Sequence, residues 1–331
     1  MLHWIRTRSR RDLILSVLIA GGFFFGVTAF LTRGIHVADG ARYETKYENR
    51  GGAAYERDFE MRSTGELEIQ VGDADVSVGA SRGDDARLVL YVDGDEVSSE
   101  AAIEELGFEI ETGSDFLGIR SREDRDWDWY ESGADVSIEV TVPSGFDIDV
   151  RTGDGDIAVG SFDGAVNLTT GDGDVAIERA SGSALRVQTG DGDVAVSGAV
   201  GGDVRIQTGD GDVAADYLEA RDIRVQTGDG DVYLESVSGE LRAMTGDGDV
   251  RVSFGEFAGA EIRTGDGDVT VIASADIQAD VVLRGTEFVI GDAFALPVAD
   301  FEDRRLEGRL NGGGAELRVQ VGDGTIQLRR R

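Results

Sequence analysis

The chain has 331 residues, and its 65 acidic side chains against 32 Lys and Arg give a formal net charge of -33. Nucleic acids and anionic membrane surfaces bind basic surfaces, so this balance argues against either as a partner of the folded part. The chain has no cysteine, which excludes disulfide bonds and thiolate metal sites.

Residues 1–33 predict a cytoplasmic arginine-rich stub and a single transmembrane helix that acts as a signal anchor. The uncharged stretch from Leu13 to Leu31 is close to the ~20 apolar residues that cross a bilayer. The arginines that precede it predict a cytoplasmic N-terminus, with the rest of the chain outside the membrane. The alternative is a signal peptide cleaved near Ala29, which would release a periplasmic or secreted protein. Residues 34–64 are polar and mixed in charge, and predict a tether.

Residues 65–145 read as an irregular region of coils and a cap at the start of the folded domain. The segments FEIE, FLGIRS and VSIEVTV predict strands, and SSEAAIEEL, at 98–106, predicts a short helix.

Three aromatic residues, Trp127, Trp129 and Tyr130, lie in an acidic loop of this region. Such rings could bind a glycan or anchor a protein partner. They could equally cover the end of the hydrophobic core. Both roles stay open from the sequence.

A regular repeat occupies residues 146–275. TGDGDI starts at residue 152, and TGDGDV starts at residues 170, 189, 208, 227, 245 and 264. The steps between copies are therefore 18 or 19 residues. The positions four and two before each Thr, and five and seven after it, are aliphatic in every copy, while the positions between them are polar or small. This alternation predicts a half-buried strand on each side of a Gly-Asp-Gly turn.

Two folds fit such a unit. Asp-Gly between alternating runs is typical of β-hairpins, which would form an antiparallel meander or barrel. The near-constant period instead favours an all-β single-stranded parallel β-helix, or β-solenoid, because each coil must match the perimeter of the next. Columns of Arg and Gln would then form ladders on one face: Arg186, Arg205, Arg224, Arg242, Gln188, Gln207 and Gln226.

Degenerate copies extend the pattern in both directions. VGDADVSV at 71–78 and VGDGTIQL at 321–328 resemble the repeat, and LRGTEFVI at 283–290 fits one step between the last regular copy and the final one. The spacing predicts that residues 276–331 continue the β-helix coil by coil to the C-terminus.

The ordered series of motifs resembles a known family. VSIEVTVPSGFDIDVRTGDGDIAV at 136–159, GAVNLTTGDGDVAI and the closing GGG…VGDG are similar to the bacterial putative-adhesin family of domains of unknown function with β-strand repeats. The resemblance covers residues 65–331. It implies a β-helical fold and a cell-envelope or surface setting, and it brings no catalytic residues.

Each copy carries two aspartates that are candidate cation ligands. Hard cations such as Ca2+ take several carboxylate and carbonyl oxygens, and stacked coils would bring the aspartates into a ladder. Calcium is the one cofactor this pattern suggests. The candidates are Asp154, Asp156, Asp172, Asp174, Asp191, Asp193, Asp210, Asp212, Asp229, Asp231, Asp247, Asp249, Asp266 and Asp268.

A structural role for the same corners is the favoured interpretation. Gly would supply positive φ at the turn, and Asp would accept hydrogen bonds from nearby N–H groups. Two exposed carboxylates ~4.8 Å apart repel by only about 1 kcal/mol in water, and by about 3.5 kcal/mol at an effective dielectric constant near 20. An exposed ladder therefore needs no metal, whereas a partly buried one needs protons, arginine neighbours or cations.

The sequence does not favour an enzyme. A β-helix that acts on polysaccharides is the alternative to consider, but seven near-identical corners provide no single place where pKa values are pushed apart. The two histidines, His3 and His36, lie in the anchor and tether, and TGDGD lacks the context of a nucleotide-binding loop. We expect a non-enzymatic, envelope-located structural or interaction protein, with an envelope protein or glycan as partner.

Overall fold

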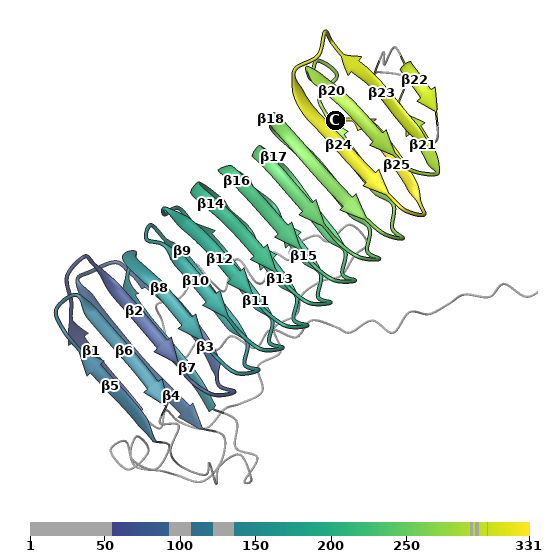
Figure 1. The fold of residues 1–331 in the computed structure, drawn as a ribbon. Helices are drawn as coiled ribbons and strands as arrows, with labels where there is room; N and C mark the ends of the chain where they lie inside the picture. Colours follow the sequence, from purple (N-terminus) through teal and green to yellow (C-terminus); the bar gives the residue numbers. More distant parts are fainter. Residues whose placement is uncertain (1–54, 93–106, 122–135, 292–293, 295–297, 303) are drawn as a thin grey trace, which may run out of the picture.

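Strands with alternating burial wind into one long solenoid (Figure 1). The computed structural model describes residues 55–92, 107–121, 136–291, 294, 298–302 and 304–331. These residues contain 25 strands and no helix, so no element in the described ranges is a helix that could cross a membrane. The predicted helices at 13–31 and 98–106 lie outside the described residues.

Each coil contributes one strand to each of two faces. In the coil that starts with β8 (Gly145–Arg151), burial alternates along the strand, and Phe146, Ile148 and Val150 point into the core. A Gly-Asp-Gly corner follows, and β9 (Ile157–Phe162) returns along the opposite side with Ile157 and Val159 buried. The face built by the strands before the corners is called the first face, and the other is called the second face.

The two faces are continuous from one end of the solenoid to the other. In spatial order the first face contains β5 (Phe108–Thr112), β6 (Phe116–Ser121), β2 (Thr64–Gln70), β8, β10 (Val166–Thr169), β12 (Ala184–Gln188), β14 (Ala199–Gln207), β16 (Leu218–Gln226), the second halves of β17 (Val232–Met244) and β18 (Val250–Thr264), β24 (Ala315–Val321), β20 (Ala279–Arg284), β23 (Arg305–Leu310) and β22 (Val298–Glu302). The second face contains β1 (Tyr55–Glu60), β4 (Asp85–Val92), β7 (Val136–Pro143), β3 (Asp75–Ser81), β9, β11 (Val175–Ala180), β13 (Val194–Val196), β15 (Val213–Ala215), the first halves of β17 and β18, β19 (Val269–Ala273), β25 (Thr325–Arg330) and β21 (Glu287–Ile290).

Neighbouring repeats pair in parallel, and they stay in register apart from local shifts in the β16–β17 and β17–β18 pairings. Val187 lies between Leu168 of the preceding coil and Ile206 of the following one, so like residues stack on like residues one repeat apart. The same columns of Val, Ile and Leu form one continuous buried core. The prediction of an all-β solenoid is confirmed, and the hairpin array is excluded because the strands of successive repeats run in the same direction.

The order of the coils at the two ends differs from the order of the chain. At the N-terminal end, β2 and β3 pair directly with β8 and β9, and the later segment β6–β7 lies outside them. At the C-terminal end, β24 and β25 pair directly with β18 and β19, while β20 and β21 lie beyond (Figure 1). The prediction that residues 276–331 add coils in chain order was therefore wrong. The final VGDG copy resembles the regular repeat most closely, and it stacks on the last regular coil.

Antiparallel strands occupy the outermost positions at the N-terminal end. Within the described residues, β1 pairs only with β4, and β5 pairs only with β6, each in antiparallel orientation. Glu56, Arg57 and Asp58 are exposed on β1, and charged side chains on an edge strand oppose pairing with another chain. β1 falls in the range 34–64 that the sequence predicted as a tether, so the folded part already includes Tyr55, which is buried.

The cysteine-free chain allows a direct test of the coil order. Glu261 and Arg318 are register partners on β18 and β24, so their Cα atoms lie at the interstrand distance that a disulfide requires. We expect Glu261→Cys/Arg318→Cys to form an intramolecular disulfide on mild oxidation, measured by free-thiol counting. The matched pair Glu261→Cys/Val282→Cys should stay reduced, because β24 separates β20 from β18. If the second pair forms a disulfide in preference to the first, β20 rather than β24 packs on β18, and the end coils follow the order of the chain.

Candidate functional site

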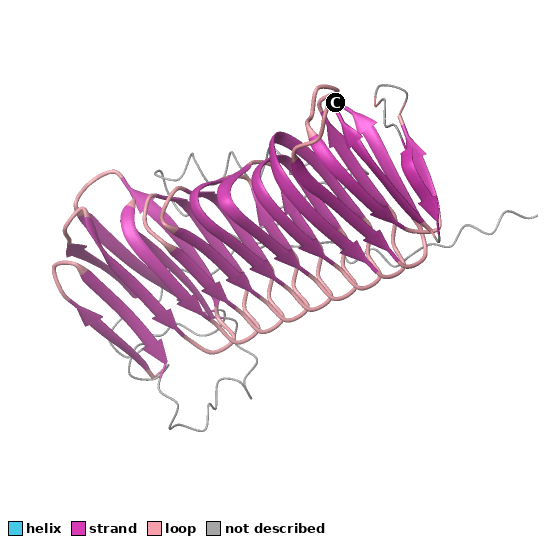
Figure 2. Ribbon diagram, turned by 45° about the horizontal axis from the view of Figure 1, so that its top comes forward, coloured by secondary structure: helices cyan, strands magenta, loops and turns pink. Residues whose placement is uncertain are grey.

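The Gly-Asp-Gly corners line up along one edge of the solenoid (Figure 2). The Thr that opens each regular corner is buried, and its hydroxyl is satisfied by the neighbouring coil. Thr208 Oγ1 donates to the carbonyl oxygen of Gly192 at 2.9 Å and accepts the N–H of Gly211 at 3.3 Å. The sequence analysis did not single out these threonines. The signal for them was available in the sequence: Thr occurs in all seven copies at the next inward-facing position after the aliphatic residues four and two before it.

The corner glycines are required by close backbone approach. A Cβ on Gly192 would lie 1.9 Å from the carbonyl oxygen of Gly173, and one on Gly173 would lie 2.1 Å from that of Gly155. Positive φ is not the reason, because among the TGDGD corner glycines and their degenerate copies only Gly324 has it. The prediction that these glycines supply positive φ was therefore wrong. They are needed because a side chain at these positions would prevent one coil from packing directly on the next.

The two aspartates of each corner occupy different environments. The first is exposed in every regular copy: Asp154, Asp172, Asp191, Asp210, Asp229, Asp247 and Asp266. The second turns back against the stack, and its carboxylate accepts the backbone N–H of the matching aspartate one coil further on. Asp174 N–H donates to Asp156 Oδ1, and Asp193 N–H donates to Asp174 Oδ1, each at 2.8 Å.

The second aspartates form a continuous inner ladder. It starts at Asp75, runs through Asp156, Asp174, Asp193, Asp212, Asp231, Asp249 and Asp268, and ends on the N–H of Thr325. The expectation that these aspartates accept nearby N–H groups is thus met, by donors from the next coil.

Burial affects the ionisation of the inner ladder near its N-terminal end. Desolvation raises the pKa of Asp156 to about 7, against the lowering effect of the Asp174 N–H, and the carboxylates of Asp75 and Asp174 raise it further. Desolvation likewise raises the pKa of Asp174, against the N–H of Asp193. The protonated form of Asp156 is therefore favoured over a wider pH range than that of a free carboxyl group, and protonation reduces the repulsion within the half-buried part of the ladder.

The candidate binding residues are only partly brought together. The fourteen aspartates form two rows along the corner edge, and within the described ranges no group of three or more His, Cys, Asp or Glu side chains is arranged to hold a metal ion. The aromatic candidates Trp127, Trp129 and Tyr130 lie outside the described residues.

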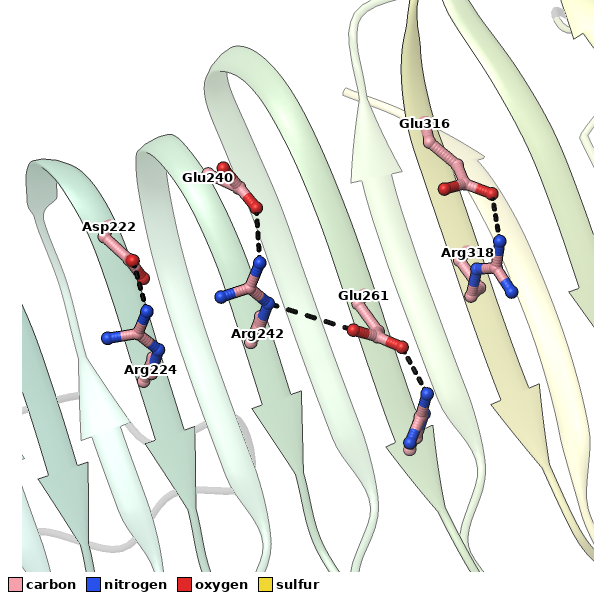
Figure 3. Close-up of polar contacts among 8 residues, drawn as sticks. Asp222, Arg224, Glu240, Arg242, Glu261, Glu316 and Arg318 are labelled. Carbon is pink, nitrogen blue, oxygen red and sulfur yellow. Dashed lines mark hydrogen bonds and ion pairs between the residues drawn. The ribbon is translucent and has the colours of Figure 1, made fainter.

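The predicted arginine and glutamine ladders lie on the first face. Arg186, Arg205, Arg224 and Arg242 are successive register partners, as are Gln188, Gln207 and Gln226. Towards the C-terminal end each arginine has an acidic neighbour on its own strand (Figure 3). Arg224 pairs with Asp222 at 2.5 Å, and Arg242 pairs with Glu240 at 2.8 Å.

Glycine-to-alanine substitution tests the close approach at the corners. We expect Gly192→Ala to lower the free energy of unfolding by roughly 2–4 kcal/mol, because the Gly173 carbonyl cannot move without breaking the stack. Gly198→Ala is the matched control, since its Cβ would meet nothing nearer than 3.8 Å. Urea unfolding measures both, and equal effects would contradict the assigned role.

The inner ladder predicts that acid stabilises the protein. A carboxyl group whose pKa is raised in the folded state contributes stability that is present below its unfolded pKa and is lost as the pH rises to about 7. Asp156→Asn keeps the acceptor for the Asp174 N–H and removes the charge. We expect its stability advantage over the wild type to be larger at pH 8 than at pH 5 by about 1–3 kcal/mol. Thermal melts at both pH values check this, with exposed Asp154→Asn as control. If Asp156→Asn leaves the stability difference between the two pH values unchanged, Asp156 is not the responsible group.

Comparison with known proteins places this architecture in a family. A model of the Toastrack DUF4097 family matches residues 64–329. No curated protein matches the chain. The chain also matches three solved structures at low sequence identity and low TM-score. One is a putative cell adhesion protein from Clostridium sporogenes ATCC 15579, with 9% identity, 83% of this chain and 99% of that chain covered, and a TM-score of 0.21. Another is a putative adhesin from Bacteroides fragilis NCTC 9343, with 13% identity, 82% of this chain and 95% of that chain covered, and a TM-score of 0.37. The third is a putative lipid binding protein from Parabacteroides distasonis ATCC 8503, with 9% identity, 84% of this chain and 98% of that chain covered, and a TM-score of 0.42. Because the family match spans nearly the whole described region, the resemblance seen in residues 65–331 is confirmed, and the chain belongs to the Toastrack DUF4097 family.

Proposed function

We propose that the protein is a non-enzymatic structural and interaction module of the cell envelope, displayed outside the membrane. One observation carries this proposal: a single uninterrupted stack of near-identical coils links both ends of the described region. The fourteen strands of the first face, about 4.8 Å apart, give a rod about 60 Å long. A rod of this kind presents the same side chains repeatedly along one direction.

The uniformity of the coils supports a binding role over a catalytic one. Catalysis requires unlike groups at one place, with different ionisation states held by different surroundings. The regular corners repeat one arrangement of Thr, Gly and Asp, with the same hydrogen bonds from coil to coil. A repeated surface suits a partner that is itself extended or repetitive.

The proposed location rests on the N-terminal segment. The uncharged residues from Leu13 to Leu31 follow an arginine-rich stub, which supports an anchor with the rod on the outer side. The high acidic content keeps the exposed rod soluble and opposes non-specific adhesion to anionic surfaces.

Cell fractionation tests the anchored location. We expect the full-length chain in the membrane fraction, released by detergent and not by salt, and a variant lacking residues 1–33 in the soluble fraction. Mass spectrometry of the mature N-terminus is the decisive measurement. A mature chain that begins at Phe30 would show cleavage and contradict the anchor.

Binding to purified envelope fractions tests the interaction role. A variant lacking residues 1–33, which cannot be held by the anchor, should be retained on envelope preparations and release no soluble fragments from them during prolonged incubation. Release of sugar or peptide fragments, absent from a heat-inactivated control, would show an enzyme instead.

A further inference from the structure

The first face carries a patch in which arginines and amides replace the acids found elsewhere. Six outward side chains of β10, β12 and β14 form it, and it is called here the arginine–glutamine patch: Asn167, Thr169, Arg186, Gln188, Arg205 and Gln207. They alternate with buried aliphatic residues, so they project from a flat surface. In a chain with a formal net charge of -33, this patch is locally basic.

The two arginines of the patch differ from those further along the same column. Arg186 and Arg205 are exposed, and no hydrogen bond or ion pair links either of them to another residue in the described ranges. The nearest acid on the same strand as Arg205 is Asp203, which pairs with Arg221 at 2.8 Å. By contrast, Arg242 contacts both Glu240 at 2.8 Å and Glu261 at 3.9 Å (Figure 3).

Two unpaired guanidinium groups on adjacent strands repel each other and leave their donors to solvent. An anion placed between them removes the repulsion, and the planar guanidinium favours a carboxylate because the two groups can form paired hydrogen bonds. Gln188 and Gln207 lie two residues beyond each arginine on the same face, and their amides both donate and accept hydrogen bonds. The coils of β12 and β14 therefore each offer one carboxylate site beside one site suited to hydroxyl groups.

The repeat distance and composition select the class of ligand. Carboxylate and hydroxyl sites recur about every 4.8 Å along the solenoid axis, comparable to the length of one pyranose residue in a chain. The patch contains no aromatic side chain on which nucleobases could stack, which disfavours a single-stranded nucleic acid. A second copy of this chain offers a row of exposed aspartates at the same spacing, but the aspartate row has no hydroxyl groups for the amides.

We propose that a linear, carboxylate-bearing polysaccharide lies along the solenoid axis across β10, β12 and β14, with successive uronate carboxylates on Arg186 and Arg205 and sugar hydroxyls on Gln188 and Gln207. This inference rests on the proposed interaction function and names its ligand. Because the polymer repeats its carboxylates, many successive pairs of its sugar residues can occupy the two arginines, which favours rebinding over dissociation.

Titration of the full-length protein in neutral detergent with hexagalacturonate tests the proposal. We expect binding that weakens as sodium chloride is added. Arg186→Gln/Arg205→Gln should weaken it about tenfold or more, because each arginine loses a charge-assisted hydrogen bond. Arg224→Gln/Arg242→Gln is the matched control on the same column, and we expect less than about a threefold effect because those arginines are already paired. Circular dichroism confirms that both variants are folded.

Two further probes separate the possible ligands. The methyl ester of hexagalacturonate should bind poorly, and polyglutamate of equal charge should bind more weakly than hexagalacturonate because it lacks hydroxyl groups. Absence of hexagalacturonate binding, equal binding of polyglutamate, or equal loss in the two double variants would overturn the proposal. Concentration-dependent self-association that disappears in Arg186→Gln/Arg205→Gln would overturn it in favour of a second copy. If hexagalacturonate fails while the protein is still retained on envelope preparations, only the ligand assignment falls.

Discussion

Every coil of this protein must present to the next coil a backbone outline that matches it at a separation of about 4.8 Å. At the corners this demand is severe, because the carbonyl oxygen of one glycine lies where a side chain of the next would begin. Each corner meets this demand with glycine at two positions, which adds no side chain. A buried Thr hydroxyl and an Asp carboxylate then form the hydrogen bonds that link it to the neighbouring coils. The near-constant period of 18–19 residues follows, because an insertion at a corner would break this match, whereas a one-residue difference is accommodated by register shifts away from the corners.

Parallel stacking also aligns like charges, and the protein moderates this in several ways. The first aspartates of the corners stay in water, where screening weakens their repulsion. The second aspartates accept backbone N–H groups, and burial raises the pKa of Asp156 to about 7, so that a proton removes part of the charge. On the first face, acids of the same strand neutralise Arg224 and Arg242. Arg186 and Arg205 have no such partner in the described ranges, which is why a ligand is proposed there and not elsewhere on the column.

The same periodicity relates the architecture to its proposed role. A stack of near-identical coils offers long rows of identical side chains along one axis. Such rows suit extended partners with a repeat of their own, since each additional coil adds a similar contact. Charged, antiparallel strands at the N-terminal end oppose the pairing of one rod with another, so the stack keeps a defined length.

The sequence by itself determined the strands, the inward columns, the corners and the arginine and glutamine ladders, because each depends on a fixed spacing that is visible in the chain. It also determined that 71–78 and 321–328 are coils, and their place next to the regular repeats agrees with their close resemblance to them. Only the tertiary structure decided the order of the end coils, the unequal burial of the two aspartates and the pairing of each arginine. Because the coils have similar sequences, the sequence does not specify which coil stacks on which. The neighbour of each coil is determined by how the whole stack and its ends pack together.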